Sequence, residues 1–145
     1  MALNLIKLCV GADSIADLEG WLAERRKAAA RAGKTYEHRH TTRMVPKRVA
    51  DLLEGGSLYW VIKGQVSARQ KLLDIQPFTD GEGIGRCHLV LEQTVVPVLP
   101  QPRKAFQGWR YFEPKDAPPD IGGKGAKVAD MPEELRRELA ALGLL

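Results

Sequence analysis

The stretch from Gly55 to Ile75 constrains the fold most, because it has the pattern of two β-strands joined by a tight turn. Leu58, Trp60 and Ile62 recur at every second position, which is the spacing of side chains on one face of a strand. Gly64-Gln65 suits a compact hairpin turn, and the residues after it continue as a strand whose faces change character along its length. Such a change is common where a sheet curls into a barrel. The chain is therefore predicted to fold around a curled hairpin.

The residues before the hairpin predict a strand, a helix, a second strand and a short helix, in that order. Residues 2–10 are apolar on both faces, which is typical of a central strand covered on both sides. Ser14 opens a capping box, and the helix that follows is expected to run to about Ala32. Residues 35–44 alternate as a strand with one polar, basic face, and Pro46 suits the first turn of another helix.

The residues after the hairpin predict more strands and a final helix. Residues 76–85 contain three glycines and are expected to form a loop, followed by an inward-facing strand over residues 86–92. Residues 94–100 suit an edge strand, because a proline cannot donate to a central ladder. Residues 100–130 are predicted to be a long loop that docks through its aromatic side chains, and residues 132–142 a helix. The predicted fold class is α+β, a small curled mixed sheet or barrel with flanking helices.

Length and composition indicate one ordinary soluble domain over residues 1–145. Apolar residues make up 44% of the chain and charged residues 28%. No apolar run approaches the ~20 residues of a membrane helix, and the N-terminus does not have the pattern of a secretory leader. The protein is therefore expected to be cytoplasmic, away from membranes. Cys9 and Cys87 are expected to be reduced and to pack as small core side chains.

The excess positive charge is concentrated in the middle of the chain. Residues 34–75 contain eight Lys/Arg against four Asp/Glu, while the chain as a whole carries +4. Cations neutralise phosphates, aromatic rings stack on bases, and the Gln and Arg of the segment 106–112 suit base edges. The alternative is a solvated charged face beside a Tyr/Trp core. The candidate nucleic-acid-binding residues are Arg43, Lys47, Arg48, Tyr59, Lys63, Arg69, Gln107, Trp109, Arg110 and Tyr111.

Metal and catalytic sites are less well supported. His38 and His40 share a strand face, but a metal site needs three or four convergent ligands, so neither a metal nor another cofactor is expected. The sequence contains no phosphate loop and no nucleophile elbow. An acid-base site in a cleft remains an alternative, and its candidate residues are Glu37, His38, His40, Lys63, Arg69 and Asp74.

Five segments carry a resemblance to a known family. They are LNLIKLCVG at 3–11, TRMVPKR at 42–48, GGSLYWVIKG at 55–64, ARQKLLDI at 68–75 and FQGWRYF at 106–112. Through them the chain, to about Asp120, resembles a bacterial conserved-hypothetical family, domain of unknown function 1489. The order of strand, proline-started helix, Gly-Gly turn and aromatic strand is also similar to PUA-like barrels, including ASCH and EVE modules. That resemblance implies binding of RNA or modified bases, and some ASCH proteins are small hydrolases or nucleases.

Together these features predict a nucleic-acid-binding module, for RNA rather than DNA. The alternatives are a small hydrolase acting on a nucleoside or nucleic acid, and a protein-interaction domain that docks a partner through its aromatic loop. A binding module is expected to show a continuous positive groove. An enzyme should show a concave pocket with titratable groups of shifted pKa, and an interaction domain an exposed apolar patch around Trp109.

Overall fold

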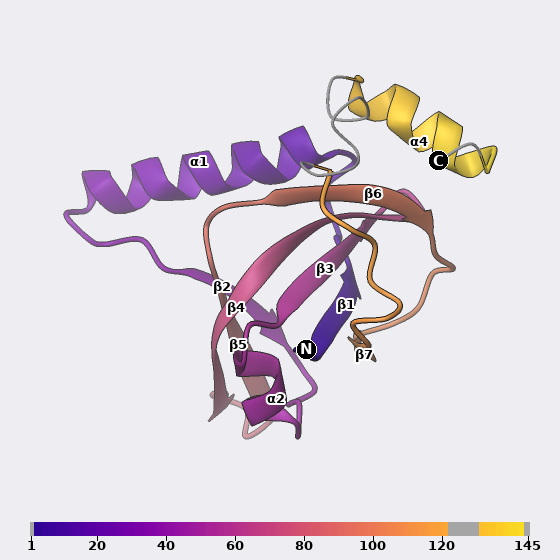
Figure 1. Cartoon of the computed structure of the whole chain (residues 1–145). Coiled ribbons are helices and arrows are strands. Elements are labelled where there is room, and N and C mark those ends of the chain that lie inside the picture. Colours follow the sequence, from indigo (N-terminus) through magenta and orange to yellow (C-terminus); the bar gives the residue numbers. More distant parts are fainter. Residues whose placement is uncertain (1, 122–130, 144–145) are drawn as a thin grey trace.

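The computed structural model describes residues 2–121 and 131–143 and shows a strongly curled sheet with helices around it (Figure 1). The predicted α+β class, with a curled mixed sheet and flanking helices, is confirmed. The elements are β1 (Asn4–Leu8), α1 (Ile15–Arg31), β2 (His38–Thr42), α2 (Val49–Leu53), β3 (Ser57–Ile62), β4 (Gln65–Thr79), β5 (Gly85–Leu91), β6 (Val96–Pro102), β7 (Trp109–Phe112) and α4 (Glu133–Ala141).

β4 is the central strand of the sheet and pairs with β3, β5 and β6. The strand order is β2-β5-β4-β3-β1-β7, with β6 also paired to β4. β1 and β3 run parallel, whereas the other pairs are antiparallel. β6 pairs with the first half of β4, over Gln65–Arg69, and β5 pairs with the second half, over Leu72–Thr79. Irregular register near Leu72 and near Val66 accompanies this division, and bulges of this kind bend a strand.

The two edges of the curled sheet, β2 and β7, are joined by side chains and not by strand pairing. The indole Nε1 of Trp109 donates to the carbonyl of Met44 at 2.8 Å. The hydroxyl of Tyr111 accepts from the backbone N–H groups of Lys47 and Arg48 at 2.9 and 3.2 Å. We call the two segments that meet here, residues 43–48 and 106–111, the seam. The sheet is therefore curled but not a closed barrel.

The face of the hairpin that the alternating apolar residues share is the inner face of the sheet. Leu58, Trp60 and Ile62 lie in the main core cluster, and Cys87, with Leu89 and Leu91, packs with them from β5. Both cysteines are buried free thiols, as expected. The outer face of β3 is buried too, because Val98, Phe106 and Phe112 belong to a second cluster that covers it.

Two predicted boundaries in this region were wrong. The tight turn is Lys63-Gly64, where φ is +49° and +77°, so it lies one residue earlier than predicted. Two consecutive residues with positive φ are typical of the turn that matches the twist of a hairpin. β4 also extends to Thr79 and so includes residues 76–79 of the predicted loop. The remaining tight loop is held by Asp80, which accepts hydrogen bonds from the backbone of Glu82 and Ile84 and from Arg86.

The predicted long loop contains a strand. β7 pairs with β1, with Trp109 opposite Lys7 and Phe112 opposite Asn4. The aromatic side chains of this segment therefore enter the cores instead of docking as an irregular loop. Residues 122–130 of the predicted loop lie outside the described part of the chain.

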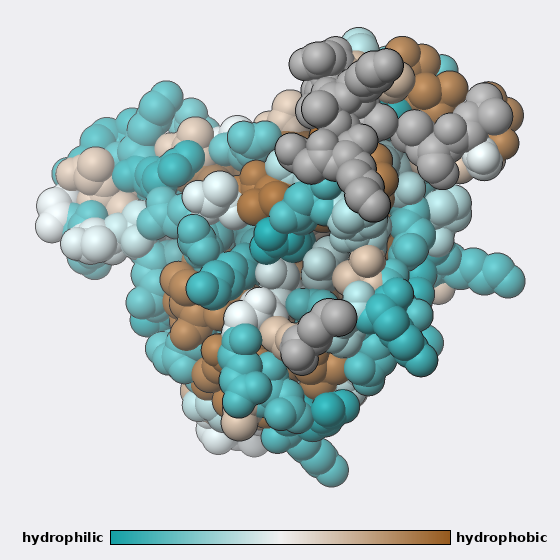
Figure 2. Space-filling view, viewed as in Figure 1, coloured by the Kyte–Doolittle hydropathy of each residue, from teal (hydrophilic) through white to brown (hydrophobic). Residues whose placement is uncertain are grey.

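The final helix is confirmed, but its orientation was not foreseen. The apolar side chains of Leu135 and Leu142 are exposed, and Figure 2 shows apolar residues of α4 at the surface. Arg136 and Ala140 are buried instead. The carboxylate of Glu133 accepts from the N–H of Ile15 at 2.8 and 2.9 Å, which satisfies a free donor at the start of α1. No helix in residues 2–121 or 131–143 is long and apolar enough to cross a membrane.

Candidate functional site

Two of the predicted stacking residues, Tyr59 and Trp109, are buried, which disfavours a stacking role for them. Tyr59 is 7% exposed and meets Phe112 edge-on in the outer cluster. Trp109 is 8% exposed and packs in the inner core, with its indole N–H bonded across the seam. Neither ring is free to stack on a base. The reason is that the chain after β5 folds back over the sheet and turns both faces into packed interfaces.

Three other predicted residues are occupied by contacts within the chain. Arg69 donates two hydrogen bonds to the carboxylate of Asp120, at 2.8 and 2.7 Å, and this pairing raises the pKa of its guanidinium. Arg48 contacts the carboxylate of Asp51 at 3.1 Å. The Tyr111 hydroxyl is held by the seam. These side chains hold the protein together, which makes them weaker candidates for a ligand surface.

The remaining predicted residues are exposed. Arg43 and Lys47 lie on one side of the seam, and Gln107 and Arg110 on the other. Lys63 lies in the β3–β4 turn, away from these four residues in sequence. Within the described residues, the four cations of this set have no carboxylate at ion-pair distance. We call Arg43, Lys47 and Arg110 the seam cations.

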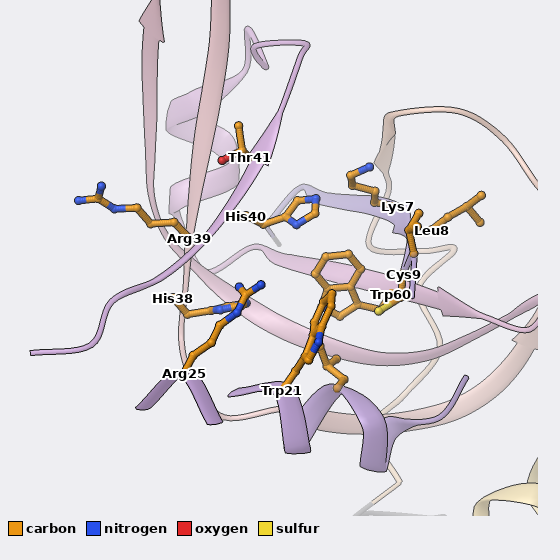
Figure 3. A pocket seen from close by; sticks show the side chains of 12 residues that line it. Lys7, Leu8, Cys9, Trp21, Arg25, His38, Arg39, His40, Thr41 and Trp60 are labelled. Carbon is orange, nitrogen blue, oxygen red and sulfur yellow. The ribbon is translucent and has the colours of Figure 1, made fainter. Parts of the chain in front are cut away.

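The structure contains a pocket that the sequence did not predict (Figure 3). It has a volume of about 360 Å³ and lies between α1 and the strands β1, β2 and β3. Arg39 also borders it but pairs with Glu37 and points away. The side chains that matter for its chemistry are Lys7, Cys9, Trp21, Arg25, His38, His40 and Trp60.

Local structure explains why polar groups face inward here. Leu5, Lys7 and Cys9 occupy alternate positions of one chain segment, and the buried Leu5 and Cys9 fix that face as the inner one. In β2, His38 and His40 pair with Leu91 and Leu89, which are core residues. A lysine among the apolar residues of this segment was the signal in the sequence, because lysine side chains are rarely buried unless they are paired.

The helix α1 supplies the pocket wall opposite the strands. Ser14 caps it by accepting from the N–H of Asp17 at 3.0 Å, and Gly33 follows its end with φ at +69°. Trp21 and Arg25 are one turn apart and therefore lie on the same side. The guanidinium carbon of Arg25 is 4.9 Å from the centre of the Trp21 ring, a cation–π contact at the pocket mouth.

The titratable groups of the pocket are shifted towards their neutral forms. Burial, assisted by Arg25, lowers the pKa of His38 to about 4. Burial, assisted by Lys7, His38 and Arg25, lowers the pKa of His40 to about 4. Burial also lowers the pKa of the Lys7 ammonium and raises the pKa of the Cys9 thiol to about 11. Both imidazoles and the thiol are therefore uncharged at pH 7.

These values favour binding over catalysis, although shifted groups in a concave pocket are a feature expected of an enzyme. A neutral imidazole with a pKa of about 4 is a weak base at pH 7. A thiol with a pKa of about 11 is almost entirely protonated and so is a poor nucleophile. Within the described residues the pocket wall contains no carboxylate that would orient or activate either group.

We expect the free energy of unfolding to fall as pH is lowered from 7 to 5. The folded-state pKa of about 4 for His38 and His40 lies below the ordinary value near 6.5, so the unfolded chain binds more protons in this window. This contribution is complete above about pH 6.5 and is lost as pH falls towards 4. Urea unfolding of the parent at both pH values measures the slope.

The double variant His38→Asn/His40→Asn should flatten that slope, whatever its own stability. His88→Asn is the matched control, because His88 lies outside the pocket and stacks on Phe78. The window ends at pH 5 so that the carboxylates of Asp80 and Asp120, whose pKa values are lowered by Arg86 and Arg69, stay ionised. Equal stability of the parent at both pH values would contradict the expected burial of neutral imidazoles.

Comparison with known proteins gave one match. The family model described as "Protein of unknown function (DUF1489)" matches residues 5–145. The match confirms the family resemblance, and it extends over the C-terminal helix, beyond the limit near Asp120 that the sequence motifs indicated. No curated protein and no solved structure matched the chain. The relationship to PUA-like barrels stays a prediction.

Proposed function

The chain belongs to the DUF1489 family, and we propose that it binds single-stranded nucleic acid through the seam cations. We propose that it binds RNA more tightly than DNA. The observation that supports this most is the position of Arg43, Lys47 and Arg110. They are exposed, they lie on two segments far apart in sequence, and they have no ion-pair partner among the described residues. The seam hydrogen bonds hold the two segments against each other.

Exposed cations without partners suit phosphate groups. An arginine already paired with a carboxylate gains little from a phosphate, because the carboxylate must first be displaced. The seam cations carry no such cost, and each one that neutralises a phosphate releases a condensed counterion. A row of such contacts gives affinity without base specificity.

Two features favour a single strand. Gln107 is exposed at the seam and can make paired hydrogen bonds to a base edge. The half-exposed ring of Trp21 offers a stacking surface that the buried Tyr59 and Trp109 do not. The preference for RNA rests on the resemblance to PUA-like barrels.

The test is a salt titration of fluorescent single-stranded RNA and DNA oligomers, read by anisotropy. Affinity should fall with salt, with a logarithmic slope of about −0.7 for each phosphate contact. Arg43→Ala and Lys47→Ala should each weaken binding and flatten the slope by about that amount. The matched controls are Arg31→Ala and Lys34→Ala, which remove exposed cations outside the seam and should leave the slope unchanged.

Two results would contradict the proposal. One is the absence of binding to any oligomer below ~50 mM salt, where electrostatic attraction is long-ranged. The other is an equal effect of the seam variants and their controls, which would indicate that net charge alone attracts the oligomer.

A further inference from the structure

We propose that the pocket between α1 and β2 binds the phosphate monoester of a nucleotide, supplied either as a free mononucleotide or as the 5′-terminal nucleotide of an RNA. The inference is carried by the pocket itself, through Lys7, Arg25, His38 and His40. It goes beyond the proposed function, because binding of a free nucleotide does not depend on the seam.

Lys7 and Arg25 have no carboxylate at ion-pair distance among the described residues. Its basic side chains come from three different elements, β1, α1 and β2, and the described residues that line it include no Asp or Glu. Figure 3 shows the Lys7 ammonium near His40, and Arg25 beside His38. Basic groups held close together disfavour one another's charged forms. A bound anion removes that conflict, so the arrangement is best explained by an anionic ligand.

Two buried nitrogen atoms lack partners. The Nε2 atoms of His38 and His40 are shielded from solvent and make no hydrogen bond within the described residues. The Nδ1 atom of His38 lies 2.9 Å from the Tyr36 hydroxyl. When that hydroxyl donates to Nδ1, the proton of the neutral ring is on Nε2, which is then a buried donor without an acceptor among the described residues. Buried polar atoms are nearly always paired, so these two indicate a missing partner.

The shape and walls of the pocket favour a nucleotide over a small anion alone. Its volume of about 360 Å³ is within the range of small-molecule sites. The indoles of Trp21 and Trp60 supply apolar walls, and the His40 ring meets Trp60 edge-on with centroids 5.1 Å apart. A phosphate monoester has three terminal oxygens and a charge near −2, which suits several donors better than a carboxylate does.

The experiment compares three probes on the parent protein by calorimetry at low salt: adenosine 5′-monophosphate, adenosine and inorganic phosphate. Adenosine 5′-monophosphate should bind, and each part alone should bind at least about tenfold more weakly, because charged hydrogen bonds and ring contacts both contribute. Lys7→Met and Arg25→Gln should each weaken binding of the nucleotide by about tenfold or more. Arg26→Gln is the matched control, since Arg26 is the next residue of α1, is exposed and does not line the pocket.

NMR of the imidazole nitrogens supplies a second readout that does not depend on variants. A bound phosphate should raise the pKa of His38 and His40 from about 4, since an anion favours the charged ring. The other groups that face these rings are Lys7 and Cys9 from the β1 segment, Arg25 from α1, and Tyr36. Unchanged imidazole signals at saturating nucleotide would overturn the proposal.

Comparing RNA oligomers that carry a 5′-phosphate with those that carry a 5′-hydroxyl distinguishes a free mononucleotide from an RNA end as the ligand of the pocket. Tighter binding of the phosphorylated RNA, lost in Arg25→Gln, assigns the pocket to an RNA end. Binding of the free nucleotide without any RNA binding keeps the pocket and removes the seam proposal. RNA binding through the seam cations, with no nucleotide binding and no effect of the 5′-phosphate, removes the pocket proposal and keeps the seam.

Discussion

Trp60→Ala is expected to lower the free energy of unfolding by about 3–5 kcal/mol, as truncation of a large buried aromatic side chain does. Trp60 is 3% exposed and lies in the inner core. Its indole Nε1 donates to the amide oxygen of Gln70 at 2.9 Å, and Gln70 is fully buried. The substitution therefore leaves both a cavity and an unpaired buried oxygen, and each of these is destabilising. Urea unfolding at pH 7 measures the change.

Trp21→Ala is the matched control for this prediction. It removes an indole of the same size that is half exposed on α1, so it should cost much less than the core substitution. Trp60→Phe keeps most of the packing and removes only the hydrogen bond, so its cost should lie between the two. An unfolding midpoint for Trp60→Ala equal to that of the parent would mean that Trp60 is not in the core.

Gly56→Ala should be at least as damaging, for a different reason. A Cβ atom at this position would lie 2.1 Å from the carbonyl oxygen of Leu3 and 2.5 Å from that of Leu52. Both obstacles are backbone atoms, and the Gly56 N–H and carbonyl are themselves bonded to Leu52 and Leu72. The start of β3 would have to move away from β1 and α2. We expect the free energy of unfolding to fall by about 4–5 kcal/mol, or the protein to fail to fold, because a severe steric conflict in the core has effects of this size.

Gly20→Ala is the control, and it should have the opposite sign. Gly20 lies inside α1, and a Cβ atom there would meet nothing within 4 Å. Replacing glycine by alanine inside a helix removes backbone entropy from the unfolded chain and should stabilise by about 0.5–1 kcal/mol. Similar effects of the two substitutions in thermal unfolding would contradict the close approach of β1, α2 and β3.

The period of the hydrophobic pattern predicted the elements up to β6 and the inner face of the hairpin, but it predicted neither β7 nor the buried face of α4. Leu58, Trp60 and Ile62 follow the alternation of a strand, and all three point inward. The same alternation placed Tyr59 on the opposite face, which was expected to be open. That face is covered by chain 39 to 53 residues further on, at Val98, Phe106 and Phe112. No local pattern predicts such coverage, because it is a tertiary effect.

The candidate site was predictable only in part for the same reason. Strand alternation put His38 and His40 on one face, but their neighbours Lys7 and Arg25 come from β1 and α1. The pairing of Arg69 with Asp120 joins residues 51 positions apart and engages a predicted phosphate-binding arginine within the chain. The charges in the sequence show which segment is rich in Lys and Arg. Only the folded structure shows which of these side chains have no ion-pair partner and can therefore contact a phosphate.

The most direct test of the phosphate-binding account is amide NMR mapping with a 5′-phosphorylated single-stranded RNA at low salt. The account predicts shifts concentrated at the seam, residues 43–48 and 106–111, and at the pocket segments 7–10 and 38–41. The tight loop at residues 80–84 and the helix α4 should change little, since neither contributes to the seam or the pocket. Shifts confined to that loop or to α4, or no shifts at all, would contradict it.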